Sequence, residues 1–449
     1  MTPGARIQAA IDILGQIDRE DQDSASLIER YFRSRRFAGA GDRRAITTRV
    51  YDNLRHRARL DWWIGRAGLA VEPDPRSRVI AQLAVYDRTS PAEMDTLFSD
   101  TRHCPEALSP AERQLADALY RRPPRHADMP KSVRLEYPAW MDASLTVLWG
   151  DQLERELQAF GQTAPVDIRV NTLKATREQV QASLAGDRVE TDPTPLSPIG
   201  LRLQGRARLG GTQGYKNGLF EVQDEGSQII ALLTGAQPGM TVVDYCAGAG
   251  GKTLALAAQM ADDPPPGEAG QAHRIRGQLI ACDVSGYRMD RMTPRLTRAG
   301  ASNIRRQTVA ARDDSWVKAN AGMADRVLAD APCTGTGAWR RDLEAKWRLR
   351  ADDMAELIET QRGVLEQAAG LVAPGGRLVY ATCSILTEEN EDQLDWFLQN
   401  VPGYTPLSIQ GVWRDTIGGT PPVEAGTWLR LSPAATDTDG FFCAVLERS

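Results

Sequence analysis

The chain has 449 residues, 42% of them hydrophobic and 25% charged, with a formal net charge of -5. This length exceeds one ordinary domain and predicts two or three, and the composition is that of a globular protein. No run of eighteen apolar residues is present, and the N-terminus has neither the continuous apolar core nor the cleavage site of a signal peptide. We therefore expect a cytoplasmic protein that does not enter a membrane.

The number and spacing of the cysteines and histidines argue against disulfide bonds and against a zinc site. Six cysteines are spread over the chain without a CxxC pair, and only four histidines occur. This pattern disfavours a disulfide framework and a zinc site, so we expect free thiols and no metal. Most of these thiols are expected in the core, and a cysteine in a polar loop would stand out.

Residues 1–130 predict helices throughout. The segments "IQAAIDILGQI" and "RRAITTRVYDNLRHRARLDWWIGRAGL" carry apolar residues at three-to-four spacing, and "GAGD" supplies a break and a cap before the second. The proline-rich segment Arg121–Ser132 marks a linker. We expect an all-helical N-terminal domain over residues 1–130.

An arginine-rich block lies inside this helical region. Between Arg30 and Arg59 there are ten arginines and two aspartates, although the whole chain is acidic. Arginine binds phosphate in a bidentate manner, and aromatic residues are interleaved with it here, which favours contact with RNA over a merely solvated helix face. The candidate contacts are Arg33, Arg35, Arg36, Arg43 and Arg44.

From residue 135 the pattern becomes mixed and then regular. Residues 135–220 contain short strand and helix patterns and predict a small α+β subdomain. Residues 221–449 alternate apolar strands with loops and helices, which predicts a parallel sheet covered on both faces, a Rossmann-like α/β domain. A proline- and glycine-rich flexible insertion, Ala261–Gly277, separates the first two strands of this domain.

Four strand patterns in the last region end in an acid or a cysteine. "MTVVDY", "GQLIACDV", "ADRVLADA" and "GRLVYATC" carry Asp244, Asp283, Asp330 and Cys383 at their ends. Ligands of open parallel sheets bind at the carboxyl ends of the strands. These four side chains are therefore expected at one site.

The loop after the first of these strands predicts an adenosyl cofactor. "DYCAGAGGKT" fits neither a P-loop, which needs a glycine at Cys246, nor the dinucleotide fingerprint, whose third glycine falls on Thr253. Its glycines let the backbone pass close to a ligand, and Asp283 can accept from a ribose diol in an NAD site or an S-adenosylmethionine site alike. The candidate cofactor-binding residues are Asp244, Cys246, Ala247, Gly248, Ala249, Gly250, Gly251, Lys252, Asp283 and Asp330.

Two cysteines stand in polar loops after neighbouring strands. "DAPCTGTG" contains Asp330 and Cys333, and "YATCSILTEENEDQ" contains Cys383 before a helix whose first turn carries Glu388 and Glu389. A thiolate is a strong nucleophile, and a helix N-terminus lowers the pKa of a nearby thiol. The pair predicts nucleophilic catalysis rather than packing.

Together, "DYCAGAGGKT", "DAPCTGTG" and "YATCSILTEENE" resemble the RNA cytosine-5 methyltransferases of the Sun/Fmu type. "RVNTLK", "FEVQDEGSQ" and "DTDGFFCAVLER" match further blocks of that family, so the resemblance covers about residues 165–448. The N-terminal "GDRRAITTRVYDNLRHRARLDWWI" is similar to the NusB-like domain of the bacterial small-subunit rRNA members. The resemblance implies S-adenosylmethionine as the cofactor and favours 16S rRNA as the substrate.

The resemblance also implies a covalent mechanism. Cys383 would add to C6 of a cytosine and so activate C5 for methylation, and Cys333 would assist the later elimination. Asp330 would bond the cytosine edge, and Lys252 would aid the base or orient the cofactor loop. The further RNA contacts that it implies are Arg169, Asn171, Lys174 and Arg340.

The chain departs from the family pattern in three places. Gly248-Ala249 stands where the family has Ala-Pro, and Asp342-Leu343 where it often has His-Pro. The acid that would face adenine is out of register, so neither Asp313 nor Asp314 is assigned that contact. These departures leave the substrate contacts near Arg340 open.

Other functions remain open at this point. The same chemistry on tRNA is a close alternative. A non-catalytic RNA-binding assembly factor would have no need of both cysteines, the cofactor loop and Asp330, all of which are intact. An NAD-dependent oxidoreductase would make the two cysteine motifs coincidental. We expect RNA as the partner, no membrane or metal, and a monomeric enzyme.

Overall fold

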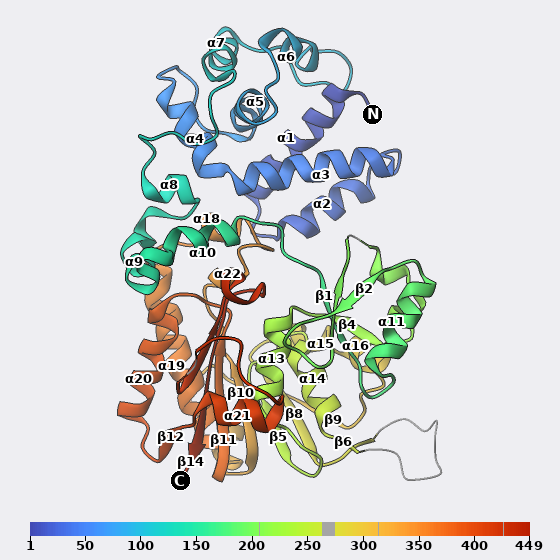
Figure 1. Cartoon of the computed structure of the whole chain (residues 1–449), viewed down its shortest axis with the longest axis vertical. Helices are drawn as coiled ribbons and strands as arrows, with labels where there is room; N and C mark the ends of the chain where they lie inside the picture. Colours follow the sequence, from blue (N-terminus) through green and yellow to red (C-terminus); the bar gives the residue numbers. More distant parts are fainter. Residues whose placement is uncertain (206, 263–273, 313, 425) are drawn as a thin grey trace. The chain divides into compact units, whose positions relative to one another are not determined.

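The structure is a computed structural model that describes residues 1–205, 207–262, 274–312, 314–424 and 426–449. Its contacts form two compact units (Figure 1). The first consists of Met1–Gln162 with Trp339–Arg350, and the second of Thr163–Ala338 with Ala351–Ser449. The predicted domain boundaries at residues 130, 135 and 220 stay predictions. Residues 131–162 belong to the first unit, because α8 (Lys131–Leu135) packs on α4 (Arg57–Arg66).

The regular elements of the first unit are helices. They are α1 (Pro3–Arg19), α2 (Ser24–Arg33), α3 (Ala40–Arg55), α4, α5 (Pro75–Val85), α6 (Pro91–Leu97), α7 (Pro110–Leu119), α8, α9 (Asp142–Trp149), α10 (Leu153–Phe160) and α18 (Ala345–Arg348). Proline at the first helical position and a serine or aspartate cap define the starts of α5, α6 and α7. The all-helical N-terminal region is thus confirmed.

One predicted helix is divided in two. The segment after "GAGD" reads as one continuous pattern, but α3 ends at Arg55 and α4 begins at Arg57, with His56 between them. Gly39 of "GAGD" is the N-cap of α3, and Asp42 accepts a hydrogen bond from the Gly39 N–H at 3.3 Å. Because of the break at His56, the first N–H groups of α4 can donate to a side chain from another segment, and those of Ala58 and Arg59 donate to Glu136.

The second unit begins with a small antiparallel sheet. Its strands are β1 (Asp167–Val170), β2 (Thr191–Pro193), β3 (Gly200–Leu203) and β4 (Phe220–Val222), in the order β2-β3-β1-β4, with helices α11 (Arg177–Gly186) and α12 (Gln213–Lys216). Every pairing in it is antiparallel. Strands and helices are mixed in this segment, as the α+β interpretation expects.

A large mixed sheet forms the rest of the second unit. Its strands follow the order β12-β14-β11-β10-β5-β8-β9, and β13 pairs with β14. Their bounds are β5 (Thr241–Asp244), β8 (Gln278–Asp283), β9 (Ile304–Thr308), β10 (Ala324–Asp330), β11 (Val372–Thr382), β12 (Tyr404–Pro406), β13 (Trp428–Leu431) and β14 (Phe441–Arg448). The five strands from β11 to β9 are parallel, and β14 is antiparallel. This is the predicted Rossmann-like fold.

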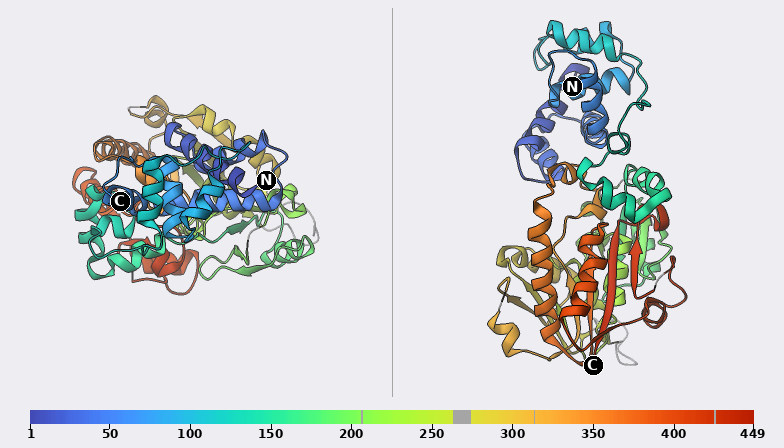
Figure 2. Two further views of the ribbon diagram at one scale, coloured as in Figure 1. Left: turned by 90° about the horizontal axis from the view of Figure 1, so that it is seen from above. Right: turned by 90° about the vertical axis from the view of Figure 1, so that its left-hand side faces the viewer.

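Helices cover both faces of this sheet (Figure 2). The helices of this part of the unit are α13 (Glu225–Leu233), α14 (Gly251–Gln259), α15 (Gly286–Asp290), α16 (Thr293–Ala299), α17 (Ser315–Ala319), α19 (Asp353–Leu371), α20 (Glu391–Asn400), α21 (Ile409–Thr416) and α22 (Pro433–Thr436). Successive strand residues enter different cores: Val242 packs with α13 and α14, and Val243 packs with α19 and α20. Cys282 and Cys443 are buried in these cores, as expected from the sequence.

Most of the insertion predicted at Ala261–Gly277 lies outside the described residues. Its two ends form a short antiparallel ribbon of β6 (Ala261–Asp262) and β7 (Arg274–Ile275). Within the described part of the chain, no helix combines the length and the apolar character that a membrane span requires.

Candidate active site

The parallel strands bring the predicted site residues to one edge of the sheet. Asp244, Asp283 and Asp330 are the last residues of β5, β8 and β10, and Cys383 directly follows β11. These strands are neighbours in the order β11-β10-β5-β8. Chain positions up to about 140 residues apart therefore meet at adjacent strand ends.

The glycine loop is bonded to the second strand end. The Gly248 N–H donates to Asp283 Oδ2 at 2.9 Å, and the Ser285 N–H donates to the other oxygen of the same carboxylate at 2.8 Å. A Cβ added at Gly248 would meet nothing within 4 Å, so the loop borders open space there. Gly250 has φ +81°, and a Cβ there would lie 2.4 Å from Met292 Cγ, so this position requires glycine.

Asp244 lies beneath this loop as a buried carboxyl. Its Oδ2 accepts from Thr253 Oγ1 at 2.6 Å, while its Oδ1 is buried and has no hydrogen-bond partner among the described residues. Burial, together with the charges of Asp330 and Asp283, raises the pKa of Asp244 to about 7, although the hydrogen bond from Thr253 opposes the shift. An orphaned carboxyl oxygen and three acidic strand ends suit a cationic ligand. S-adenosylmethionine carries a sulfonium and an ammonium group and fits this donor and acceptor set.

The other loop residues surround the same turn. The Ala247 N–H donates to the Cys282 carbonyl at 2.8 Å, and Arg295 of α16 donates to the Ala249 carbonyl at 2.7 Å. Burial and three neighbouring carboxylates raise the pKa of Cys246 well above that of a free thiol, so it stays protonated. Gly251 is the first residue of α14, whose early N–H groups lack partners within the helix.

Lys252 and Asp330 form an ion pair at the third strand end. Lys252 Nζ lies 2.6 Å from Asp330 Oδ2, and the lysine side chain is largely buried. Burial alone would lower the pKa of Lys252, but the charge and hydrogen bond of Asp330 outweigh it and raise that pKa. The ammonium therefore stays charged and holds the Asp330 carboxylate in place.

The two predicted catalytic cysteines are in contact. Cys333 Sγ and Cys383 Sγ lie 3.5 Å apart. The hydrogen bond to Cys383 and burial raise the pKa of Cys333 well above its ordinary value. Cys333 therefore stays protonated, and its thiol can donate a hydrogen bond to Cys383 Sγ.

Glu389 joins the two cysteine loops and was not identified as a site residue from the sequence. Its buried carboxylate accepts from the Thr334 N–H at 2.8 Å and from the Thr334 and Ser384 hydroxyls. Gln361 of α19 also donates to it, at 2.9 Å. Thr334 follows Cys333 and Ser384 follows Cys383, so one carboxylate positions both thiols. Glu389 lies in a 3-10 turn (Thr387–Glu389) before α20 rather than in the first turn of that helix.

Glycine is also required where the cysteine loops meet. The Gly337 N–H donates to the Cys383 carbonyl at 2.8 Å. A Cβ at Gly337 would lie 2.0 Å from the Gly440 carbonyl oxygen and 2.7 Å from that of Cys383. The second "TG" of "DAPCTGTG" is thus explained by close backbone approach.

Three implied RNA contacts bond to other groups of the second unit in this structure. Arg169 is 1% exposed and donates to Gln223, and burial lowers its pKa to about 10. Asn171 is buried and donates to the carbonyls of Gly218 and Ala299. Lys174 is exposed, but its ammonium donates to two backbone carbonyls. The side chains of Arg169 and Asn171 are not presented to a ligand here, because they satisfy buried backbone and amide groups.

The implied RNA contacts of the first unit differ in exposure. Arg33, Arg36 and Arg44 are exposed, whereas Arg35 stacks over the Tyr31 ring at 3.8 Å and Arg43 donates to the Ala38 carbonyl. Arg340 is 5% exposed and belongs to this unit. The arginine block is therefore partly a surface and partly a set of local contacts.

The acid expected toward adenine remains unassigned. Asp313 lies outside the described residues. Asp314 caps α17 by accepting from the Trp316 and Val317 N–H groups, and it also accepts from the Ala310 N–H at 2.6 Å. Both of its carboxylate oxygens thus accept from the backbone.

The fold and this site define a Rossmann-like methyltransferase whose cofactor is S-adenosylmethionine. Comparison with known proteins gives its family. Residues 231–447 match the family described as 16S rRNA methyltransferase RsmB/F, and residues 137–209 match the ferredoxin-like domain of RsmF/B-like methyltransferases. The chain belongs to the RsmB/F family, which confirms the resemblance to the Sun/Fmu type.

Relatives and solved structures agree with this assignment. "Ribosomal RNA small subunit methyltransferase B" of Sodalis glossinidius is 33% identical over 344 residues, which cover 76% of this chain and 69% of that protein. "Probable ribosomal RNA small subunit methyltransferase B" of Synechocystis is 29% identical and covers 98% of this chain and 99% of its own length. The solved structure of PH0851 matches with a TM-score of 0.77 at 29% identity, over 100% of this chain and 99% of that one.

Proposed function

We propose that this protein methylates C5 of a cytosine in small-subunit rRNA through a covalent cysteine adduct. The observation that carries the proposal is the contact of Cys333 and Cys383, with sulfur atoms 3.5 Å apart at the strand edge that also holds the Lys252–Asp330 pair. Methylation of a base nitrogen or a ribose needs no such thiol pair. The description of the matched family, 16S rRNA methyltransferase RsmB/F, names 16S rRNA, and this supports that substrate over tRNA.

The first step forms a bond between Cys383 and the base. The Cys383 thiolate adds to C6 of cytosine, and the electron pair of the C5–C6 double bond makes C5 nucleophilic. N3 takes up a proton from solvent as the C6–S bond forms and returns it on release of the base. Asp330 accepts hydrogen bonds from N3–H and N4–H and so stabilises this protonated adduct, while Lys252 holds that carboxylate. Bound S-adenosylmethionine supplies the electrophilic methyl group that C5 takes up.

The second step releases the product. The proton on C5 leaves, the C6–S bond breaks, and Cys383 recovers its thiolate. In the adduct Cys383 is a neutral thioether, which removes the first cause of the raised pKa of Cys333. Cys333 can then release its own proton to solvent and, as a thiolate, accept the proton from C5. Release of the base thus depends on Cys333, and attack depends on Cys383.

We assign RNA binding to the two segments that precede the catalytic domain. We propose that residues 1–130 form a NusB-like RNA-binding domain, that residues 135–220 form an RNA-binding α+β subdomain, and that residues 221–449 carry the catalytic domain. The exposed Arg33, Arg36 and Arg44 support the first assignment. The target base must leave its stack to reach a strand-end pocket, which favours a loop or single strand of RNA.

Bisulfite sequencing of total RNA from cells with and without the gene tests this function. We expect one cytosine of the 16S rRNA to be protected only when the gene is present. Complementation with Cys383→Ser should not restore protection, whereas Cys104→Ser, at a cysteine of the other unit, should restore it in full. Protection of a tRNA cytosine instead would replace the substrate, and unchanged protection everywhere would refute cytosine-5 methylation.

A further inference from the structure

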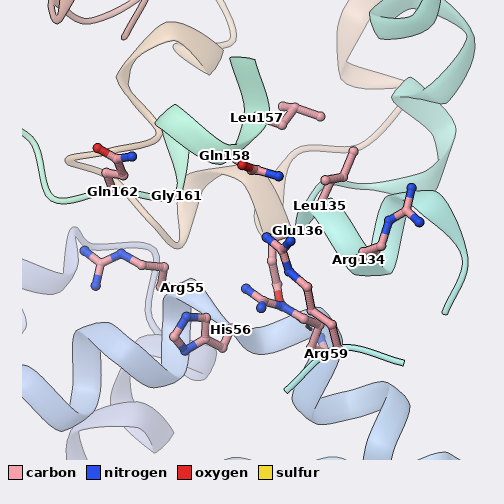
Figure 3. Close-up of a pocket in the computed structure, with 11 residues that line it drawn as sticks. Arg55, His56, Arg59, Arg134, Leu135, Glu136, Leu157, Gln158, Gly161 and Gln162 are labelled. Atoms are coloured by element: carbon pink, nitrogen blue, oxygen red, sulfur yellow. Dashed lines mark hydrogen bonds and ion pairs between the residues drawn. The ribbon is translucent and has the colours of Figure 1, made fainter. Parts of the chain in front are cut away.

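A cavity in the first unit is lined by four arginines, Arg55, Arg59, Arg125 and Arg134 (Figure 3). None of them is among the five candidate contacts, although Arg55 and Arg59 belong to the arginine-rich block. Its volume is about 320 Å³. Arg55, His56 and Arg59 come from the break between α3 and α4, and Arg134 to Glu136 come from α8 and its end. Arg125 and the segment from Leu157 to Gln162 complete the wall. Four cationic side chains thus face one small space with a single carboxylate.

The carboxylate of this pocket is already bonded. Glu136 accepts from the Ala58 N–H at 2.9 Å, from the Arg59 N–H at 3.2 Å and from Arg59 Nε at 2.7 Å. It therefore caps the N-terminus of α4 and neutralises Arg59. The contacts described for Glu136 include no hydrogen bond with Arg125 or Arg134.

Two of the other arginines pair with carboxylates that do not line the pocket, those of Asp52 and Glu154. Arg55 pairs with Asp52 at 3.0 Å, and Arg125 lies 3.9 Å from Glu154 with both side chains about half exposed. The Nε of Arg134 is buried without a hydrogen-bond partner among the described residues. A ligand with several acceptor oxygens would satisfy that donor and reach Arg125 without breaking a buried pair.

Positive charge near the pocket also contributes to the low pKa values of two neighbouring groups. Burial, followed by the charges of Arg59, Arg55 and Lys346, lowers the pKa of His56 to about 3. Burial lowers the pKa of Lys346 to about 8, opposed by Glu136 and aided by Arg55 and Arg59. The four arginines that line the pocket outnumber its one carboxylate, so the local potential favours an anion.

We propose that this pocket, lined by Arg55, Arg125 and Arg134, binds a backbone phosphate of the substrate RNA. The ligand is a phosphodiester because guanidinium groups form paired hydrogen bonds to its two free oxygens, and because a cavity of about 320 Å³ admits the phosphate of one nucleotide. The proposal rests on the proposed function, since the RNA is that enzyme's substrate. It adds a phosphate site separate from the surface arginines of the block.

The test compares pocket variants with a matched surface variant in the full-length protein. Arg125→Gln and the double variant Arg125→Gln/Arg134→Gln remove pocket charge. Arg113→Gln is the control, because Arg113 is also half exposed and pairs with a half-exposed carboxylate, that of Asp95. RNA affinity is measured from 50 to 300 mM salt with a transcribed 16S rRNA fragment and with polyuridine of equal length, and thermal unfolding confirms that each variant is folded.

We expect the double variant to bind both RNAs about tenfold more weakly at 0.1 M salt, with a salt slope smaller by about one for each phosphate that is no longer neutralised. Arg125→Gln alone should show the same change at reduced size, and this keeps the test decisive if the double variant does not fold. Affinity and slope equal to those of Arg113→Gln would overturn the proposal. A loss confined to the rRNA fragment would also overturn it, because a phosphate contact is indifferent to sequence.

A separate measurement with the wild-type protein keeps the two proposals apart. Transfer of labelled methyl groups to the rRNA fragment reports on the proposed function alone. If the wild type transfers no methyl group to cytosine while the affinity difference persists, the proposed function fails and the phosphate site stands. If methyl transfer occurs and the affinity difference is absent, only the phosphate site fails.

Discussion

The sulfur atoms of Cys333 and Cys383 lie 3.5 Å apart, although the two residues are 50 positions apart in the chain. The contact follows from strand pairing, because Asp330 and Ala381 are register partners in the parallel strands β10 and β11. The loops that continue from these two residues must leave the sheet side by side. This strand pair therefore places both thiols where the proposed mechanism would use them in turn.

The two cysteines should fail in different ways when they are replaced. Cys383→Ser should reduce methyl transfer roughly a thousandfold or more, because no thiolate remains to add to C6. Cys333→Ala should instead accumulate a covalent protein–RNA complex, because attack proceeds and release does not. Denaturing gels of the protein with RNA and S-adenosylmethionine check both. A complex that needs Cys333 and not Cys383 would reverse the assigned roles.

Glu389 should act as a positioning residue for both thiols. Glu389→Gln replaces an acceptor of four hydrogen bonds by an amide, so we expect kcat to fall about 10- to 100-fold with RNA affinity within twofold of the wild type. In the Cys333→Ala background the same change should slow adduct formation by the same factor. Glu388→Gln, at the adjacent and partly exposed position, is the control and should leave both rates near the wild type. Equal rates for the two variants would remove Glu389 from the site.

Asp244 should make the free enzyme less stable as the pH rises. Its pKa is about 7 in the folded protein and 3.8 in the reference state, so the folded state binds more protons between these values. The free energy of unfolding should then fall from about pH 4 to pH 7, by an amount on the order of a few kcal/mol. Urea unfolding at pH 5 and pH 8 checks this, and Asp244→Asn should lose that part of the pH dependence. A variant with the full wild-type dependence would contradict the assignment.

Gly337 should be intolerant of a side chain. Gly337→Ala would place a Cβ 2.0 Å from the Gly440 carbonyl oxygen, and we expect a loss of about 1–3 kcal/mol in the free energy of unfolding. Methyl transfer should fall as well, because the Gly337 N–H supports the Cys383 carbonyl. Gly411→Ala in α21 is the control: its Cβ meets nothing within 4 Å, and the change should stabilise the helix by about 0.5–1 kcal/mol. Thermal unfolding distinguishes the two.

The exposed arginines of the N-terminal block should contribute to RNA affinity through charge. Replacing Arg33, Arg36 and Arg44 by glutamine should weaken binding at low salt and reduce the salt slope by about one for each phosphate that these arginines neutralise. Arg43→Gln is a useful comparison. The Arg43 guanidinium already donates to the Ala38 carbonyl, so its loss should weaken RNA affinity less. Filter binding across a salt series measures this, and an unchanged slope in the triple variant would make the block a solvated surface.

Much of the active site could be predicted from the sequence because parallel strands obey a simple rule. The apolar runs before Asp244, Asp283, Asp330 and Cys383 identify buried strands, and the carboxyl ends of parallel strands share one edge. The glycines of the loop and the two cysteine motifs then indicate a cofactor and a nucleophile. These inferences need only local pattern and the direction of the chain.

Other features were decided by packing between segments that the local pattern does not relate. Glu389 is one of two adjacent glutamates, and only the fold shows that it bonds to Thr334 and Ser384 from different loops. Arg169 is an arginine in a family motif, yet the antiparallel sheet buries it against Gln223. The pocket of Arg55, Arg125 and Arg134 exists because α3 ends at Arg55 and the end of α8 enters the gap. Which polar side chains are buried and which remain exposed depends on these long-range contacts, whose energies no single stretch of sequence contains.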